Sequence, residues 1–138
     1  MRPPSRPVVT LDRLTLYRYM LYREPMDLVE FLPLPQAQYH VLVALTEGER
    51  HGYAIMQAVD TSSGGVVRMG PATLYGTLKK LVAAGLVEET AHRPEAGDDA
   101  RRRYYRLTGL GADVCLAESD RLAQLVDRTR SNLRPGMA

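Results

Sequence analysis

Apolar residues recur at steps of three and four over much of the chain, a spacing that predicts α-helices. The first such segment covers residues 10–24, and its apolar face contains Leu11, Leu14, Tyr17 and Leu21. Prolines then interrupt the pattern, so we expect residues 26–35 to form an irregular connection. Met26 is a second candidate for the first residue of the protein.

Three further helices are predicted in the middle of the chain. The first covers residues 36–46, and the second covers residues 52–61 and ends at a Ser-Ser-Gly-Gly run. The third opens at Gly70 and Pro71, because proline is favoured at the first helical position, where its missing N–H would be unpaired anyway. Gly85 stands where this helix is expected to end.

After the third helix the apolar spacing changes, and a last helix follows. Residues 86–92 and 102–107 are predicted strands of a hairpin with a polar loop at 93–100. Thr108 caps a helix over 109–133, roughly 37 Å long at 1.5 Å per residue. Its apolar stripe is too long for one small domain to cover, so we expect a second copy to bind it. The expected dimerisation residues are Leu110, Val114, Ala117, Leu122, Leu125 and Val126.

This order of elements predicts a mainly α fold with a small β-hairpin. Three helices followed by a hairpin are typical of a winged helix-turn-helix, whose third helix enters the DNA major groove while the hairpin follows the backbone. We therefore divide the chain into an N-terminal extension with an extra helix (1–35), a winged helix-turn-helix DNA-binding domain (36–107) and a C-terminal dimerisation helix (108–138).

Composition narrows the class of protein less than the pattern does. Eighteen Lys and Arg against sixteen Asp and Glu give a net charge of +2, too small by itself to indicate nucleic acid. Cys115 is the only cysteine, which excludes an intrachain disulfide and fits a reducing compartment. Without a secretory signal or an apolar run near the ~20 residues of a membrane span, we expect a cytoplasmic protein with no membrane partner.

The outward face of the third predicted helix suits DNA. Thr73, Gly76 and their small neighbours let a helix approach base edges closely, and Tyr75 lies beside them. Lys79 and Lys80 follow on the same side, where they would bind phosphates, although two adjacent lysines are also typical of an ordinary solvated surface. We predict that these five residues contact DNA.

Arginines gather in the second strand of the hairpin, and strand alternation divides their roles. If Leu107 faces the core, Tyr105 and Arg103 do too, and the opposite face carries Arg102, Tyr104 and Arg106. Arg103 would then pair with a carboxylate of the neighbouring strand, Glu88 or Glu89. The remaining arginines, Arg101, Arg102 and Arg106, are expected to bind DNA phosphates or enter a minor groove.

Four runs in fixed order resemble the PadR family of transcriptional regulators over roughly residues 38–112. They are 51–56 (HGYAIM), 64–81 (GGVVRMGPATLYGTLKKL), 85–87 (GLV) and 101–108 (RRRYYRLT). The single last helix resembles the shorter subfamily, in which that helix makes the dimer. The resemblance implies a homodimeric repressor that binds an inverted-repeat operator in double-stranded DNA and is released by a small-molecule effector. Members that bind flat aromatic drugs between their dimer helices use tryptophan, which this chain lacks.

The sequence contains no candidate residues for a metal site, a nucleotide-binding loop or a catalytic nucleophile. The three histidines have no metal-ligand spacing, no phosphate-binding glycine loop is present, and neither Cys115 nor a serine lies in a nucleophile motif. We therefore expect no enzyme activity, no metal and no cofactor. The alternative function is a winged-helix protein-interaction module that does not bind DNA, favoured by the near-neutral charge and the extra N-terminal helix.

Overall fold

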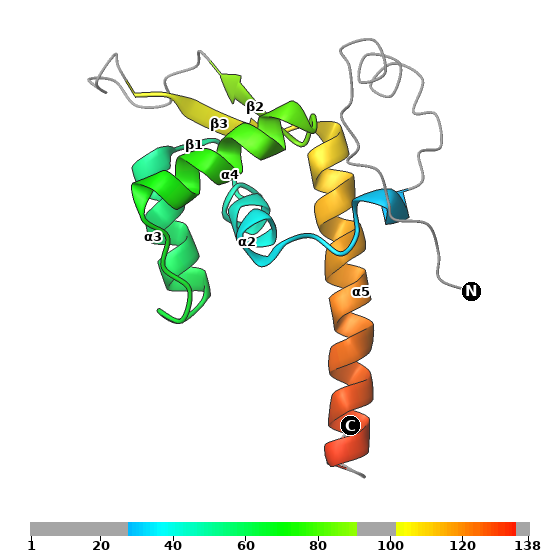
Figure 1. Ribbon diagram of the computed structural model, residues 1–138. Helices are drawn as coiled ribbons and strands as arrows, with labels where there is room; N and C mark the ends of the chain where they lie inside the picture. The colour runs from blue at the N-terminus through cyan, green and yellow to red at the C-terminus, as the bar shows by residue number, and fades with distance from the viewer. Residues whose placement is uncertain (1–27, 91–101, 135–138) are drawn as a thin grey trace.

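The computed structural model describes residues 28–90 and 102–134. The helix predicted at 10–24, the hairpin loop at 93–100 and Arg101 lie outside the described residues. In chain order the elements are η1 (Leu28–Phe31), α2 (Gln36–Ala44), β1 (Arg50–His51), α3 (Gly52–Ser62), α4 (Pro71–Ala83), β2 (Val87–Thr90), β3 (Tyr104–Leu107) and α5 (Gly109–Leu133) (Figure 1).

The predicted helices form close to their expected bounds. Helix α4 begins with Pro71 in its first turn and is followed by Gly85 at φ 77°, a left-handed conformation that stops a helix and suits glycine. Helix α5 begins after Thr108, whose hydroxyl oxygen accepts a hydrogen bond from the Gly111 N–H at 2.9 Å. That hydroxyl also donates to the Gly85 carbonyl at 2.6 Å, which joins the start of α5 to the end of α4.

The sheet has one strand more than the sequence pattern predicts. Its order is β1-β3-β2, antiparallel throughout, so β3 is the central strand and is covered on both edges. Tyr104 was expected on the solvent face, but it is buried, and this prediction was wrong. The His51 ring, carried by β1, packs edge-on against the Tyr104 ring, with 5.6 Å between the ring centroids, and covers it. The neighbouring Tyr105 joins the core.

Helices α2 to α5 and strands β2 and β3 all contribute to the hydrophobic core. Its largest wholly buried side chains are those of Leu42, Ile55, Leu74, Leu78, Leu81, Leu86 and Leu110. On α4, Val82 is exposed, whereas Thr77 is buried and its hydroxyl donates to the Thr73 carbonyl at 2.7 Å. Leu32 and Leu34 also join the core, which therefore contains residues from all three segments of the predicted division.

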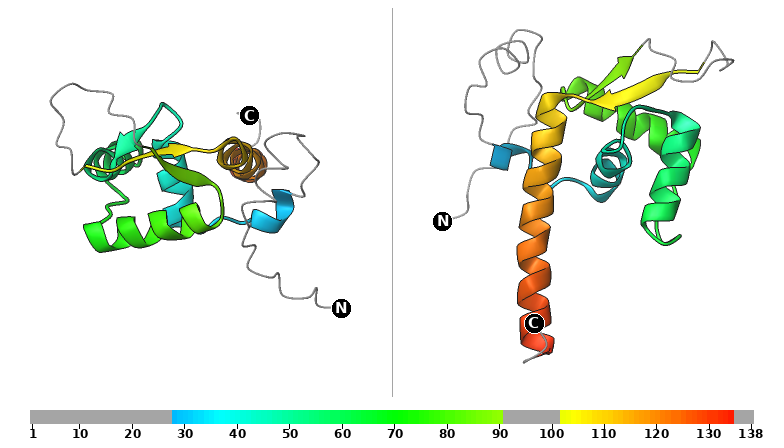
Figure 2. Two further views of the ribbon diagram at one scale, coloured as in Figure 1. Left: turned by 90° about the horizontal axis from the view of Figure 1, so that it is seen from above. Right: turned by 180° about the vertical axis from the view of Figure 1, so that it is seen from behind.

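Helix α5 has two parts with different surroundings. Its first part packs beside the sheet and α2, and its C-terminal part extends past the other described elements (Figures 1 and 2). Leu110 and Val114 were predicted in the dimer interface, but both lie wholly inside the core of the protomer, so neither has surface left for a partner in this conformation. Leu116 is exposed on another side of the helix, and further along, Leu125, Val126 and Leu133 are exposed as well.

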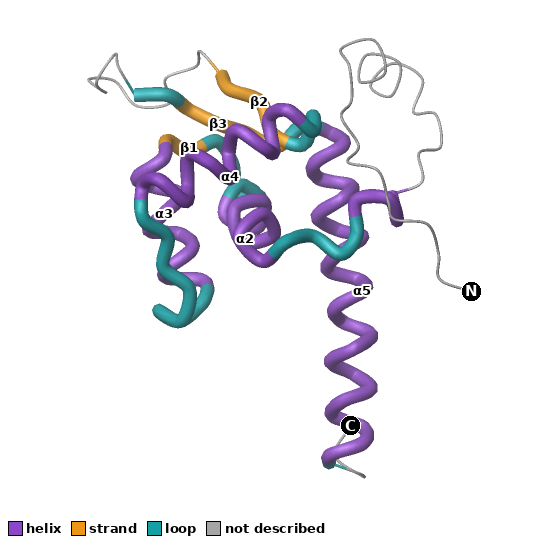
Figure 3. The backbone as a smooth tube through the Cα atoms, in the orientation of Figure 1, coloured by secondary structure: helices purple, strands orange, loops and turns teal. Residues whose placement is uncertain are grey.

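Polar contacts fix the chain before α2 against α5. Glu118 on α5 is 1% exposed, and its Oε2 accepts a hydrogen bond from the Leu34 backbone N–H at 2.6 Å. Arg121 Nε donates to the other carboxylate oxygen, and the hydroxyls of Tyr39 and Ser119 are hydrogen-bonded at 2.7 Å. These contacts hold the long helix in a defined direction relative to α2, with the sheet at the N-terminal end of α5 (Figure 3).

Candidate nucleic-acid interface

Helix α4 has one buried and one exposed face. Leu74, Leu78 and Leu81 pack into the core, whereas the residues predicted to contact DNA are all exposed: Thr73, Tyr75, Gly76, Lys79 and Lys80. A Cβ added at Gly76 would meet nothing within 4 Å, so the surface there is open. The helix thus presents small residues in its first half and two cations in its second half.

The connection between α3 and α4 is fixed by its own hydrogen bonds. The Ser63 hydroxyl accepts from the Val67 N–H at 3.0 Å and lies 3.1 Å from the Val67 carbonyl, to which it can also donate. Gly64 and Gly65 turn the chain at φ 63° and 81°, and Arg68 lies 3.6 Å from Asp60 on α3. The turn therefore sets the position of α4 relative to α3, as a helix-turn-helix requires.

The hairpin arginines divide differently from the prediction. Arg106 Nε donates to Glu88 at 2.7 Å, and this hydrogen bond raises the pKa of the Arg106 guanidinium. Arg103 pairs with Glu89 at 3.6 Å, one of its two expected partners, although its side chain is largely exposed instead of facing the core. Because Arg106 already has a carboxylate partner, its predicted phosphate contact would require it to leave or share Glu88.

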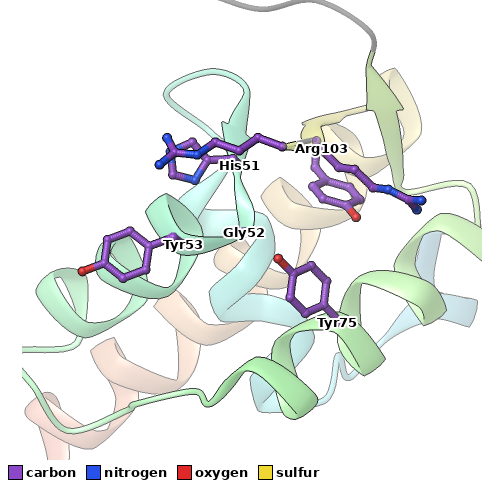
Figure 4. A pocket seen from close by; sticks show the side chains of 7 residues that line it. His51, Gly52, Tyr53, Tyr75 and Arg103 are labelled. Carbon is purple, nitrogen blue, oxygen red and sulfur yellow. The ribbon is translucent and has the colours of Figure 1, made fainter. Parts of the chain in front are cut away.

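A crevice opens between the start of α3, the side of α4 and β3. It has a volume of about 470 Å³ and is lined by His51, Gly52, Tyr53, Tyr75, Arg102, Arg103 and Tyr105 (Figure 4). The Tyr75 hydroxyl points toward Gly52, where a Cβ would lie only 2.5 Å from the hydroxyl oxygen, so glycine is what allows this approach. Burial, together with the nearby Glu89 carboxylate and the Tyr75 hydroxyl, raises the pKa of Tyr105 and outweighs the opposite effect of Arg103.

His51 and Tyr53 also lie on this surface, although the sequence pattern did not predict them there. Tyr53 is 61% exposed, and the Nε2 atom of His51 lies 3.3 Å from Nη1 of Arg102, which is 51 residues further along the chain. The signal that could have found them is the HGY run itself, which forms the start of a helix that packs against α4. The strand pairing of β1 with β3 brings the two segments together.

The described residues contain neither a metal-binding cluster nor a membrane span. No group of three or more His, Cys, Asp and Glu lies close enough to hold a metal ion in residues 28–90 and 102–134. Within the same ranges, every helix is too short or too polar to cross a membrane. Cys115 is buried in the core, and burial raises the pKa of its thiol.

Comparison with known proteins identifies related sequences over most of these elements. The sequence profile of the family described as "Transcriptional regulator PadR-like family" matches residues 41–116, from α2 into α5. An uncharacterized 37.1 kDa protein in transposon TN4556 of Streptomyces fradiae is 36% identical over 99 residues. That match covers 72% of this chain, but this chain spans only 26% of the relative's length.

Solved structures share the arrangement of helices and sheet. RosR of H. salinarum is 30% identical with a TM-score of 0.51, covering 76% of this chain and 82% of that one. PadR of Bacillus subtilis in complex with operator DNA is 24% identical with a TM-score of 0.51, covering 65% of this chain and 48% of that one. The second likeness shows a shared fold.

Proposed function

This chain belongs to the PadR-like family of transcriptional regulators, and on that premise we propose that it binds double-stranded operator DNA as a homodimeric repressor. One observation carries the proposal: α4 presents an exposed face of small residues and cations above a buried apolar face. A helix of this kind enters the major groove closely enough for its side chains to reach base edges. The structure of Bacillus subtilis PadR in complex with operator DNA supports the choice of partner.

Within this proposal the exposed residues of α4 have two roles. Thr73, Tyr75 and the open backbone at Gly76 approach the bases, while Lys79 and Lys80 neutralise phosphates. Asn, Gln and Arg, which make bidentate base contacts, are absent from α4. Specificity should therefore depend on few direct contacts and on the shape of the DNA.

The far end of α5 supports the dimer. Leu122, Leu125, Val126 and Leu133 recur at helical spacing on the same side of α5 that faces the core further up the helix, and Leu125 and Val126 are 51% and 44% exposed. A shallow apolar hollow on this stripe is lined by Leu122, Leu125, Val126, Thr129 and Arg130. A second copy of the stripe would remove these side chains from water and bring two α4 helices onto one DNA duplex.

Repression and release follow from the geometry of such a dimer. Two recognition helices must lie about 34 Å apart to enter successive major grooves on one face of the duplex. The crossing of the two α5 helices sets this separation, so a small-molecule effector that binds one crossing better than the other would change operator affinity. A dimer bound to an inverted repeat that overlaps a promoter would block transcription, and the effector would release the dimer from the DNA.

Selection of bound fragments from the organism's genomic DNA tests this function. We expect the purified protein to enrich fragments that share an inverted repeat, and light scattering to give the mass of a dimer. Lys79→Ala and Lys80→Ala should each reduce the slope of log affinity against log salt by about one. No enriched sequence and no complex at low salt would instead favour a module that docks on proteins.

A further inference from the structure

The two ring nitrogens of His51 have different neighbours. Nδ1 lies 3.2 Å from the backbone nitrogen of Ala54 and accepts its hydrogen bond, so His51 acts as the N-cap of α3. Nε2 lies 3.3 Å from Nη1 of Arg102. His51 thus lies between the start of α3 and the segment leading into β3, at one side of the crevice described above.

These contacts determine which hydrogens face each other. A nitrogen that accepts a hydrogen bond carries no proton, so the cap bond places the proton of the neutral imidazole on Nε2. The Arg102 guanidinium has only donors and keeps its charge. Two N–H donors therefore point into the same space, and one acceptor oxygen placed there could bind both.

We propose that one phosphate of the DNA backbone occupies this position, with an oxygen accepting hydrogen bonds from His51 Nε2 and from Arg102. This inference rests on the proposed DNA binding and adds a contact beyond α4. The charged side chains among the described residues that line the crevice are Arg102 and Arg103, and since Arg103 is paired with Glu89, Arg102 is the cation that would attract an anion on the His51 side. Tyr53, beside His51 and 61% exposed, has a hydroxyl available to the same backbone.

The position also fits the geometry of the proposed complex. The crevice lies alongside α4, and Tyr75 of α4 forms one of its walls (Figure 4). When α4 lies in the major groove, the sugar-phosphate backbone that borders the groove passes beside the helix. A phosphate held by His51 and Arg102 would fix how deeply and at what angle α4 enters.

The variant His51→Asn separates the phosphate contact from the cap. Asparagine is a favoured N-cap residue, so its side-chain oxygen replaces Nδ1 as the acceptor for the Ala54 N–H, and α3 keeps its cap. Its shorter side chain leaves no donor at the position of Nε2. Because the lost donor is neutral, we expect operator affinity to fall about fivefold while the salt slope stays unchanged.

Arg102→Gln supplies the complementary change. Removing a cation that contacts a phosphate should lower affinity about tenfold and reduce the salt slope by about one. Arg134→Gln, which removes one cation at the far end of α5, is the matched control and should leave both quantities unchanged. Melting temperatures of all variants show whether the fold is retained, and Arg102→Gln keeps the test open if His51→Asn does not fold.

A set of operator duplexes, each with one phosphate replaced by a neutral methylphosphonate, locates the contact. At one position in each half-site, replacement should weaken wild-type binding and cancel most of the effect of both variants. If the wild-type protein binds its operator but His51→Asn and Arg102→Gln bind equally well, or no single phosphate cancels both effects, this inference is wrong and the proposed function stands. If the wild-type protein binds no DNA, both fall together.

Discussion

Replacing Glu118 with alanine would remove the acceptor that holds the chain before α2 against α5. The Leu34 N–H would then be buried without a hydrogen-bond partner, which costs about 1–3 kcal/mol. The Arg121 side chain is 39% exposed and regains water, so its lost pairing adds little. We expect the free energy of unfolding to fall by about 2–3 kcal/mol in total.

Urea denaturation at one fixed protein concentration measures this loss, because the stability of a dimer depends on concentration. Glu118→Gln keeps an acceptor for Leu34 and should cost only about 1 kcal/mol. Asp120→Ala, an exposed acid two residues away, is the control and should leave stability within about 0.5 kcal/mol. Hydrogen exchange of the Leu34 amide should be faster in Glu118→Ala, because it reports local opening at this position independently of the global free energy of unfolding. Unchanged stability together with unchanged exchange at Leu34 would refute the account of this anchor.

Three further predictions concern the same helix. The hydrogen bond from Arg121, aided by that from Leu34, lowers the pKa of Glu118 against the effect of burial. The ionised carboxylate therefore stabilises the fold above the ordinary carboxyl pKa, and this contribution is lost as the pH falls below about 4. Glu118→Gln should show a flatter acid denaturation profile, and an identical profile would count against this. In Gly111→Ala, the new Cβ would overlap the Leu86 carbonyl oxygen and come within 2.8 Å of its carbon, so we expect a loss of about 3 kcal/mol or more by thermal denaturation, whereas an unchanged melting temperature would contradict this packing. Leu125→Glu should convert the dimer to a monomer in light scattering, because a charge buried in an apolar interface loses its hydration. Ser131→Glu, on the opposite side of α5, should remain dimeric. A dimeric Leu125→Glu variant would show that the apolar stripe is not the dimer interface.

Elements whose signals are local could be predicted well from the sequence. The start of α5 and its Thr108 cap were predicted because a capping residue directly precedes a long run of apolar residues at helical spacing. Helix α4 was predicted for the same reason, with proline at its start and Gly85 after its end. These signals depend only on the backbone conformation that each residue prefers.

Features made by distant segments could not be predicted in the same way. Strand β1 has two residues, too few for a period, and its partner β3 lies more than fifty residues further on. Without β1, the alternation of residues along β3 predicts that Tyr104 faces solvent, and nothing in the sequence indicates that His51 lies next to Arg102. Similarly, the stripe on α5 did not reveal that the protomer's own core covers Leu110 and Val114, because periodicity shows which side is apolar but not what packs on it.

Fluorescence anisotropy with one selected operator duplex and one scrambled duplex of equal length, titrated at several salt concentrations, tests the central claim most directly. The account predicts that the wild-type protein binds the operator more tightly than the scrambled duplex by a factor of about 10³ or more, as is usual for specific recognition. Affinity for both duplexes should fall steeply with salt, and Lys79→Ala should lower that slope by about one for each duplex. Equal affinity for the two duplexes, or no binding to either at low salt, would contradict sequence-specific DNA recognition by this fold.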